Sequence, residues 1–373
     1  MNSASEPLTS RNVLHLPTGV RRRALVYCAG ATDGMQFVVT DTPQVGSIPK
    51  GDDELLIQVR AVALNPVDYK LPLLVPFAWF FLRGLPVCQD FAGVVVSAPP
   101  SSSFPVGTRV FGTCEGTRGG CASDFISVRA SNVAVIPPSL SFAHAASLNT
   151  VAQTAIQAFR RGGLSAGGRV LIIGASGGCG TAGIQCARAI VGPTGFVAGV
   201  CSGGSAKLVR ELGTDATFDY HNEEIMAALK AVEPFDVIYD TVSSGGEKGD
   251  DFHGIPYATA FRPFLKEKRG CIVAINGTVL QWLGAIFCDT ILQRRCCSSS
   301  GRNGHGGGYA LIMQNHSSKD LNLIRTWAED KQLRAIIDGV FPFTAEGCAN
   351  AFARVKSRRA KGKVVLMLGA DNE

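Results

Sequence analysis

A glycine-rich segment between an apolar run and a helix-like pattern constrains the fold of this chain more than any other feature. It runs from Val170 to Ile190 and reads VLIIGASGGCGTAGIQCARAI, with Gly174, Gly177 and Gly180 spaced by three. This is a variant of the G-x-G-x-x-G pattern in which the first two glycines stand further apart. Glycines let a backbone approach a pyrophosphate closely, and free N–H groups at the start of a helix bind anions. The segment therefore predicts the strand, loop and helix that open a dinucleotide-binding unit.

Strand-like and helix-like patterns alternate after residue 142, whereas short strands and Pro/Gly turns dominate before residue 138. We expect strands at 170–173, 196–200, 216–219, 236–239 and 270–275, and helices at 181–191, 206–212 and 223–231. This rhythm predicts an α/β fold with a doubly wound parallel sheet, preceded by a mostly β half. An Ala-rich helix is expected at 143–160, with a boundary near Asn149-Thr150. The last strand, 363–368, is expected to rejoin the N-terminal β region.

The end of the second strand of the unit indicates which nucleotide the glycine loop takes. A site for NAD carries an Asp or Glu there, which binds the ribose hydroxyls. This strand instead runs into Cys201-Ser202-Gly203-Gly204, with no acid to repel a 2′-phosphate. Ser202 can donate a hydrogen bond, Lys207 can supply positive charge, and Tyr220 adds a hydroxyl if the next strand end lies alongside. These residues favour NADPH over NADH, although Lys207 fits a solvated helix position equally well.

Composition and charge exclude several classes of protein. The 373 residues are 46% hydrophobic and 18% charged, as is typical of a globular chain with a large core. The net charge of +6 comes without long Lys/Arg runs, so nucleic acid is not an expected partner. No apolar run approaches the ~20 residues of a transmembrane helix. The 12 cysteines form no C-x-x-C pair and indicate free thiols rather than a disulfide framework or a zinc ribbon.

The first 23 residues leave the compartment open. They contain four arginines, one acid and no secretory apolar region. A cytosolic tail and a weak mitochondrial presequence both fit that composition. We expect a cytoplasmic protein and keep a mitochondrial one as the alternative.

Six short motifs occur in order along the chain. They are LNPVDYK at 64–70, QDFAG at 89–93, GASGGCG at 174–180, CS at 201–202, DY at 219–220 and GKV at 362–364. Each motif is weak alone, but the ordered series resembles the medium-chain dehydrogenase/reductase superfamily, in its zinc-free quinone oxidoreductase (zeta-crystallin-like) branch. The resemblance is closest to reticulon-interacting mitochondrial oxidoreductases and to alkenal/enone reductases. It extends from about Arg22 to Leu368.

The resemblance implies a fold of two domains. After a tail at 1–23, a GroES-like, mostly β domain would be built from residues 24–145 and 323–373. A Rossmann domain that binds NADPH would be inserted between them, at 146–322. Dimers are common in this family, so we expect a homodimer or a monomer.

The resemblance also assigns cofactor contacts to the residues at matching positions. Those that would meet the phosphates are Ser176, Gly177, Gly178, Cys179, Ser202 and Tyr220, with Lys207 as a less clean match. Those that would lie near the nicotinamide are Asn65, Thr154, Asn276 and Gly277. Tyr309 and Lys363 are weaker matches to cofactor-binding positions. Cys179 stands where the family usually carries Val, and we expect it to serve packing rather than redox chemistry.

The metal ligands of zinc alcohol dehydrogenases are missing from the corresponding positions. Asn65-Pro66-Val67-Asp68 offers no thiol, Gln89-Asp90-Phe91 replaces the Gly-His-Glu of the zinc branch, and the six histidines show no metal spacing. Without a Lewis acid nothing stabilises an alkoxide, so simple alcohol oxidation is disfavoured. Hydride addition to a conjugated carbonyl instead places the charge on an enolate oxygen, which hydrogen-bond donors can stabilise.

The sequence therefore predicts NADPH-dependent, metal-independent reduction of a small-molecule electrophile, a quinone or an α,β-unsaturated carbonyl compound. Asn65 is the expected catalytic donor to the carbonyl, although a turn residue that caps local backbone would also be Asn. Tyr69 is a candidate proton source, with a core position as its alternative. Two other functions remain open: an NADPH-binding partner or regulatory protein with little turnover, and an enoyl-thioester reductase.

Overall fold

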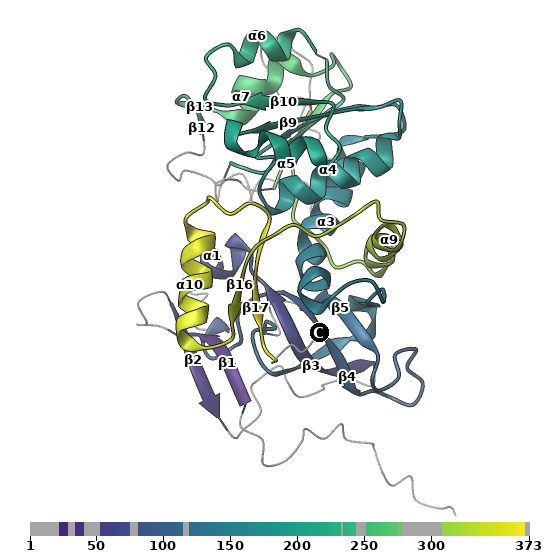
Figure 1. Cartoon of the computed structure of the whole chain (residues 1–373), viewed down its shortest axis with the longest axis vertical. Helices are drawn as coiled ribbons and strands as arrows, with labels where there is room; N and C mark the ends of the chain where they lie inside the picture. The colour runs from purple at the N-terminus through teal and green to yellow at the C-terminus, as the bar shows by residue number, and fades with distance from the viewer. Residues whose placement is uncertain are drawn as a thin grey trace, which may run out of the picture.

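Two β-sheets with one long helix between them organise the chain (Figure 1). The computed structural model describes residues 22–28, 34–40, 53–74, 81–114, 119–232, 234–243, 251–275, 277 and 308–369. The sheet in the lower lobe of Figure 1 is mixed, and the sheet in the upper lobe is parallel. Across these described residues, no helix is both long and apolar enough to span a membrane.

The lower sheet is assembled from both ends of the chain. Its seven strands follow the order β16-β17-β3-β4-β5-β7, and β6 pairs with β3. Their bounds are β3 (Glu54–Ala63), β4 (Asp90–Ser97), β5 (Arg109–Thr113), β6 (Phe125–Arg129), β7 (Val133–Val135), β16 (Ile337–Pro342) and β17 (Lys363–Met367). The antiparallel pairing of β17 with β3 confirms that the last strand rejoins the N-terminal β region.

The upper sheet has the doubly wound arrangement that the alternating pattern predicts. Its order is β10-β9-β8-β11-β14-β15, and every neighbouring pair is parallel. The strands are β8 (Arg169–Ile173), β9 (Phe196–Cys201), β10 (Ala216–Asp219), β11 (Val237–Asp240), β14 (Cys271–Ala274) and β15 (Gly308–Leu311). The strand order reverses between β8 and β11, and ligands of such sheets bind at the carboxyl ends of the strands at this point.

Helices and two short hairpins complete the described chain. The helices are α1 (Pro66–Leu74), α3 (Phe142–Gly162), α4 (Gly178–Val191), α5 (Ala206–Glu211), α6 (Ile225–Lys230), α7 (Tyr257–Phe261), α9 (Ser318–Glu329) and α10 (Ala345–Lys356). The hairpins pair β1 (Arg22–Tyr27) with β2 (Met35–Thr40) and β12 (Asp251–Phe252) with β13 (Ile255–Pro256). The upper sheet takes residues 169–311 and the lower one the segments on either side, and the exact domain boundaries at 145/146 and 322/323 stay predictions.

The long helix α3 is one continuous element. It begins after Ser141, whose side chain accepts from the His144 N–H, and ends at Gly163 with a left-handed φ of 75°. The predicted boundary at Asn149-Thr150 is wrong, because the helix continues through both residues and their side chains bond to strands of the lower sheet. The Asn149 amide, for example, donates to two carbonyl oxygens of β4 and β5, at 3.0 and 2.8 Å.

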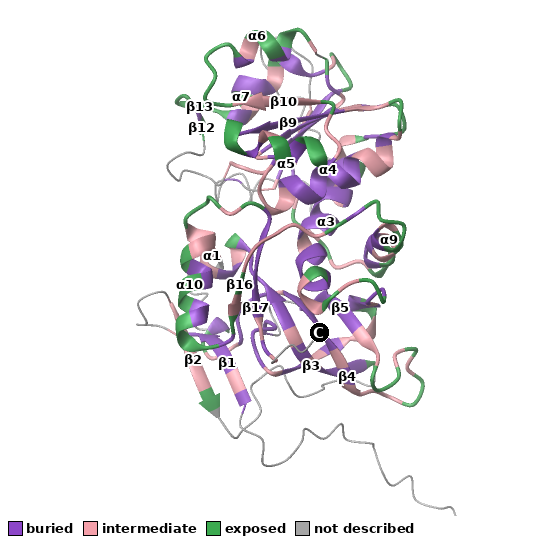
Figure 2. Ribbon diagram, in the orientation of Figure 1, coloured by how far each residue is buried: buried purple, intermediate pink, exposed green. Residues whose placement is uncertain are grey.

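The main apolar core surrounds α3, as the purple ribbon of Figure 2 shows. The helix contacts β3, β4, β5 and β17 of the lower sheet and β11 and β14 of the upper one. At its C-terminal end the fully buried Phe159 ring meets the Tyr239 ring edge to face, with centroids 5.3 Å apart. One helix therefore holds both sheets in a single packed body.

Replacing Phe159 with Ala tests this central role of α3. The substitution leaves a cavity between helix and sheet, and we expect the free energy of unfolding to fall by about 3–5 kcal/mol. Urea titration followed by circular dichroism measures the loss. The control is Phe81→Ala, at a ring that is 80% exposed, for which a change within about 0.5 kcal/mol is expected. Equal losses in the two variants would contradict the assignment.

Candidate cofactor site and active site

The glycine loop lies where the sequence predicts it, between the carboxyl end of β8 and the start of α4. Gly177 is the N-cap residue of α4, and no side chain caps the helix. The first N–H groups of a helix have no acceptor within the helix, and their partial positive charge attracts anions. The uncapped start of α4 therefore fits the predicted role of the loop as a phosphate site.

Steric contacts explain the glycines of this loop. Gly174 has a φ of 77°, and a Cβ on Gly180 would lie 2.2 Å from the Gly174 carbonyl oxygen. A Cβ on Gly178 would come within 3.0 Å of the Lys363 side chain, whereas one on Gly177 would meet nothing closer than 3.5 Å. The protein itself therefore requires glycine at 174 and 180. At 177 the open space fits the close approach of a pyrophosphate.

Two further residues of the loop have clear positions. The Ser176 carbonyl accepts from the Gly362 N–H at 2.9 Å, which ties the loop to the lower domain. Cys179 packs against the main core, and burial raises the pKa of its thiol to about 11. A thiol with that pKa stays protonated and poorly nucleophilic at neutral pH. This supports the predicted packing role of Cys179.

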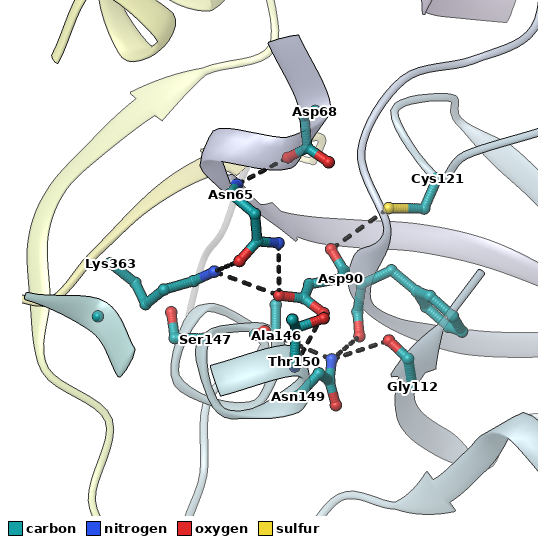
Figure 3. Close-up of polar contacts among 12 residues, drawn as sticks. Asn65, Asp68, Asp90, Gly112, Cys121, Ala146, Ser147, Asn149, Thr150 and Lys363 are labelled. Carbon is teal, nitrogen blue, oxygen red and sulfur yellow. Dashed lines mark hydrogen bonds and ion pairs between the residues drawn. The ribbon is translucent and has the colours of Figure 1, made fainter. Parts of the chain in front are cut away.

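A carboxylate at the start of β4 gathers the candidate active-site residues (Figure 3). Asp90 accepts four hydrogen bonds: at Oδ1 from the Thr150 N–H (3.0 Å) and hydroxyl (2.5 Å), and at Oδ2 from the Asn65 amide (2.9 Å) and Lys363 Nζ (3.2 Å). Lys363 Nζ also donates to Asn65 Oδ1 at 2.6 Å. Asn65, Asp90 and Lys363 are all at most 5% exposed. We call Asp90, Asn65, Thr150 and Lys363 the Asp90 network.

Local capping fixes the backbone of Asn65 at the N-terminus of α1. Asn65 precedes Pro66, which occupies the first helical position, where its missing N–H costs nothing. Three residues on, Asp68 Oδ2 accepts from the Asn65 backbone N–H at 2.7 Å, in the manner of a capping box. The backbone of Asn65 is thus held by its own helix, and its side chain is left for Asp90 and Lys363. The predicted role of Asn65 as a side-chain donor fits this geometry. The local cap is supplied by the Asp68 carboxylate instead, because both polar atoms of the Asn65 side chain bond to Asp90 and Lys363.

Burial has a strong effect on Asp68. Its carboxyl group is buried beneath the Asn65 loop, and this burial raises its pKa to about 7. The hydrogen bond from Asn65 and the Lys363 charge act in the opposite direction and lower the pKa, but less than burial raises it. A group with this pKa changes its charge near neutral pH, directly beside the Asp90 network.

The residues predicted for a 2′-phosphate lie at adjacent strand ends. Cys201 of β9 pairs with Asp219 of β10, so that Ser202 and Tyr220 follow side by side. Ser202 Oγ lies 3.2 Å from Ser205 Oγ, and Tyr220 is 37% exposed. Lys207, in contrast, points to solvent, with its side chain 88% exposed and 4.0 Å from Glu211.

Sequence reasoning missed two charged residues near Ser202. Lys361 reaches across from the lower domain, and its Nζ donates to the Gly204 carbonyl at 2.9 Å. Asp219 lies beside the same loop, because a Cβ on Gly203 would be 2.6 Å from its Oδ2. Lys361 stands 157 residues from Gly204 in the sequence, so no local pattern could reveal it.

The other predicted residues are only partly brought together. Thr154 is buried one turn beyond Thr150 on the same face of α3. Tyr69 packs with the lower apolar core, and two ammonium groups, of Lys70 and Lys356, lie over its ring at 6.0 and 5.5 Å. Tyr309 of β15 packs with the upper apolar cluster rather than within the Asp90 network. Gly277 is buried, and Asn276 lies outside the described residues.

The donor chemistry of the network does not suit a metal ion. A carboxylate has about four lone-pair positions, and Asp90 uses them for four donors. One of those donors is an ammonium group, which would repel a cation. Within the described ranges, no group of three His, Cys, Asp or Glu residues could hold a metal. The nine cysteines described there are free thiols.

Comparison with known proteins agrees with this architecture. The family model of the alcohol dehydrogenase GroES-like domain matches residues 51–138, and that of zinc-binding dehydrogenases matches residues 212–366. The human mitochondrial NAD(P)H oxidoreductase RTN4IP1 is 31% identical over 346 residues, which cover 84% of this chain and 81% of that protein. The trans-enoyl reductase pgmF of Aspergillus terreus is 29% identical over 338 residues, covering 85% and 87% of the two chains.

Among solved structures, the quinone oxidoreductase from Coxiella burnetii superposes with a TM-score of 0.73 at 22% identity. The match covers 94% of this chain and all of that one, and it shows the shared fold. With the ordered motifs and the inserted parallel sheet, these matches show that the chain belongs to the medium-chain dehydrogenase/reductase superfamily, in its zinc-free quinone oxidoreductase branch.

Proposed function

We propose that the chain is an NADPH-dependent, metal-independent reductase that reduces a small-molecule quinone or an α,β-unsaturated carbonyl compound. The observation that carries this proposal is the buried Lys363 ammonium group, held by Asn65 and Asp90 beside the glycine loop. The relatives named NAD(P)H oxidoreductase and trans-enoyl reductase support the reaction class. When bound, NADPH would supply the hydride, and the protein supplies orientation and electrostatics.

Lys363 and Asn65 retain donors for a substrate oxygen. An ammonium group has three N–H donors, and Lys363 gives two of them to Asn65 Oδ1 and Asp90 Oδ2. The Asn65 amide has two N–H donors and gives one to Asp90. The remaining N–H groups belong to side chains that Asp90 holds in place, so little reorganisation is needed when charge develops. Together they are suited to stabilise the oxyanion of an enolate or a hydroquinone.

The fixed ammonium group distinguishes this site from that of a zinc alcohol dehydrogenase. A Lewis acid stabilises an alkoxide, which is strongly basic. An enolate spreads its charge and needs less stabilisation, which hydrogen-bond donors can give. The proton that completes the reduction of an enone goes to the carbon next to the carbonyl, and solvent can deliver it. We therefore expect reduction of activated carbonyl systems rather than oxidation of simple alcohols.

The strand ends of β9 and β10 support NADPH as the cofactor. Ser202 and Tyr220 offer hydroxyl groups, and Lys361 brings positive charge to the same loop. The positive charges of Arg210 and Lys361 also act to lower the pKa of the neighbouring Cys201 thiol, which burial and Asp219 raise to about 11. Asp219 is the competing feature, since a carboxylate could bind the ribose hydroxyls of NADH. Its Oδ1 already accepts from the His221 N–H at 3.0 Å.

An enoyl-thioester reductase is the second candidate, and the relative named trans-enoyl reductase favours it. The chemistry at the β-carbon is the same, so the Asp90 network does not discriminate between the two. Activity on acyl thioesters without activity on free enones would select it. Tight NADPH binding without turnover on any electrophile would select the third reading, a binding or regulatory protein.

Cofactor preference can be measured directly by fluorescence titration with NADPH and NADH. We expect NADPH to bind at least about tenfold more tightly, which corresponds to roughly one charge-assisted contact to the 2′-phosphate. Lys361→Ala should remove most of that preference, whereas Lys207→Ala, at a side chain that is 88% exposed, should change it little. Equal affinities of the wild type for the two cofactors would overturn the 2′-phosphate assignment and point to Asp219.

Turnover tests the reaction class. The purified chain should oxidise NADPH with naphthoquinone, phenanthrenequinone or short enones, and the rate should be unchanged after dialysis against a strong chelator, because Asp90 has no lone pair left for a metal. Oxidation of simple alcohols with NADP⁺ should be undetectable. A loss of activity that added Zn²⁺ restores would show that the reaction is not metal-independent.

A further inference from the structure

The turn between α10 and β17 connects the two halves of the site. We call residues Arg358–Lys363 the strap. In Figure 1 this yellow segment rises from α10 toward the upper lobe before it returns as β17. Its last residue is Lys363 of the Asp90 network, and Lys361 is the lysine beside the Ser202 loop. The strap therefore carries one lysine to the Asp90 network and another to the Ser202 loop.

Three hydrogen bonds join the strap to three loops of the upper sheet. The Gly362 N–H donates to the Ser176 carbonyl after β8 (2.9 Å), and Lys361 Nζ to the Gly204 carbonyl after β9 (2.9 Å). Arg358 Nη2 donates to the Val242 carbonyl after β11, at 3.1 Å. These loops follow the carboxyl ends of neighbouring strands, where dinucleotides bind in this fold.

The conformation of the strap is demanding and needs support. Arg358 has a φ of 58° and Gly362 a φ of 90°. A Cβ on Gly362 would lie 2.2 Å from the Ile336 carbonyl oxygen, so only glycine fits there. A left-handed conformation at a residue other than glycine costs free energy and persists when surrounding contacts impose it. Those contacts come from behind the strap, from β16 and α10.

Asp338 of β16 is the centre of that support. Its Oδ1 accepts from the Lys361 backbone N–H at 2.8 Å, and both of its oxygens accept from Arg354, at 2.6 and 2.8 Å. Arg354 in turn donates to the Arg359 carbonyl at 3.1 Å. The Asp338 side chain is 9% exposed, and the bond from Arg354 lowers the pKa of its carboxyl group. The carboxylate thus stays charged at neutral pH and fixes the middle of the strap.

We propose that Asp338 is a positioning residue for the cofactor: it holds the strap so that Lys361 meets the 2′-phosphate of NADPH while Lys363 stays in the Asp90 network beside the substrate oxygen. The proposal rests on the proposed function, because the strap needs that dinucleotide as its ligand. Holding a lysine backbone in place before binding lowers the ordering cost that the ligand must otherwise offset. Within the described part of the chain, the side chain of Asp338 hydrogen-bonds to the strap and to Arg354, so its effect on the cofactor would pass through the strap.

The test compares Asp338→Asn with a matched control. An amide keeps the shape but has one acceptor. With its oxygen at the Oδ1 position it turns an NH2 group toward Arg354 Nε, and with its oxygen at the Oδ2 position it loses the Lys361 N–H, so the charge-assisted support of the strap is weakened in either orientation. Asp236→Asn is the control, since Asp236 also accepts from a backbone N–H (Arg169, 2.8 Å) and a cation (Lys266, 2.8 Å), at the opposite end of the upper sheet. Calorimetry measures the Kd of NADPH and of 2′,5′-ADP, with 5′-AMP as the probe that lacks the 2′-phosphate.

Asp338→Asn should weaken NADPH and 2′,5′-ADP by about five- to tenfold, a typical effect of one misplaced charged contact, and leave 5′-AMP unchanged. Asp236→Asn should leave all three Kd values unchanged even if it lowers the Tm. A merely destabilised protein would weaken 5′-AMP as well, so such a uniform loss would overturn the proposal.

A double-mutant cycle shows whether Asp338 acts through Lys361. Lys361→Ala keeps the backbone N–H that Asp338 binds and removes only the side chain. If the proposal is right, Asp338→Asn should cost much less 2′,5′-ADP affinity in the Lys361→Ala background than in the wild type. Additive losses would contradict it. If the wild type binds NADPH but Asp338→Asn binds it equally well, this inference alone fails; if the wild type does not bind NADPH, the proposed function fails as well.

Discussion

The four hydrogen bonds to Asp90 are the interaction on which the rest of the site depends. They join three elements that are far apart in the sequence: the mouth of α1 through Asn65, the middle of α3 through Thr150, and the start of β17 through Lys363. Because α3 also packs on both sheets, the same carboxylate fixes the lower domain against the helix that supports the upper one. These contacts fix the Lys363 ammonium group beside the glycine loop.

A buried ion pair of this kind is poor evidence for stability. Removing Lys363 and Asp90 from water costs free energy that their attraction repays only if every remaining donor and acceptor is satisfied. Here Thr150 and Asn65 fill the other positions of the carboxylate, and Lys363 keeps a donor toward the site. Replacing a buried ion pair by apolar residues of similar volume often leaves the stability of the fold unchanged or raises it. We infer that the charges are retained to stabilise the oxyanion that forms on the substrate.

The sequence predicted those parts of the site that depend on local patterns. The strand, loop and helix around Gly174 follow from glycine spacing and apolar runs. Ser202 and Tyr220 lie side by side because parallel strands bring their carboxyl ends together. Thr150 was missed because an Asn-Thr pair is typical of a helix boundary. Its role depends on hydrogen bonds to Asp90, which is distant in the sequence. Lys361 and Asp338 were missed for the same reason. Their partners lie far away in the sequence, and no local pattern of residues indicates such a contact.

The single-turnover rate of enone reduction by the NADPH-loaded protein carrying Lys363→Met tests whether Lys363 stabilises the oxyanion. Methionine keeps an apolar stem against Gly178 and removes the charge. If Lys363 has this role, the hydride-transfer rate should fall by roughly 10²–10³, the usual loss for a preorganised oxyanion donor. NADPH affinity should stay nearly unchanged, and Lys363→Arg should recover part of the rate. An unchanged rate, or a loss confined to NADPH affinity, would contradict this role and make Lys363 a ligand of the cofactor phosphates.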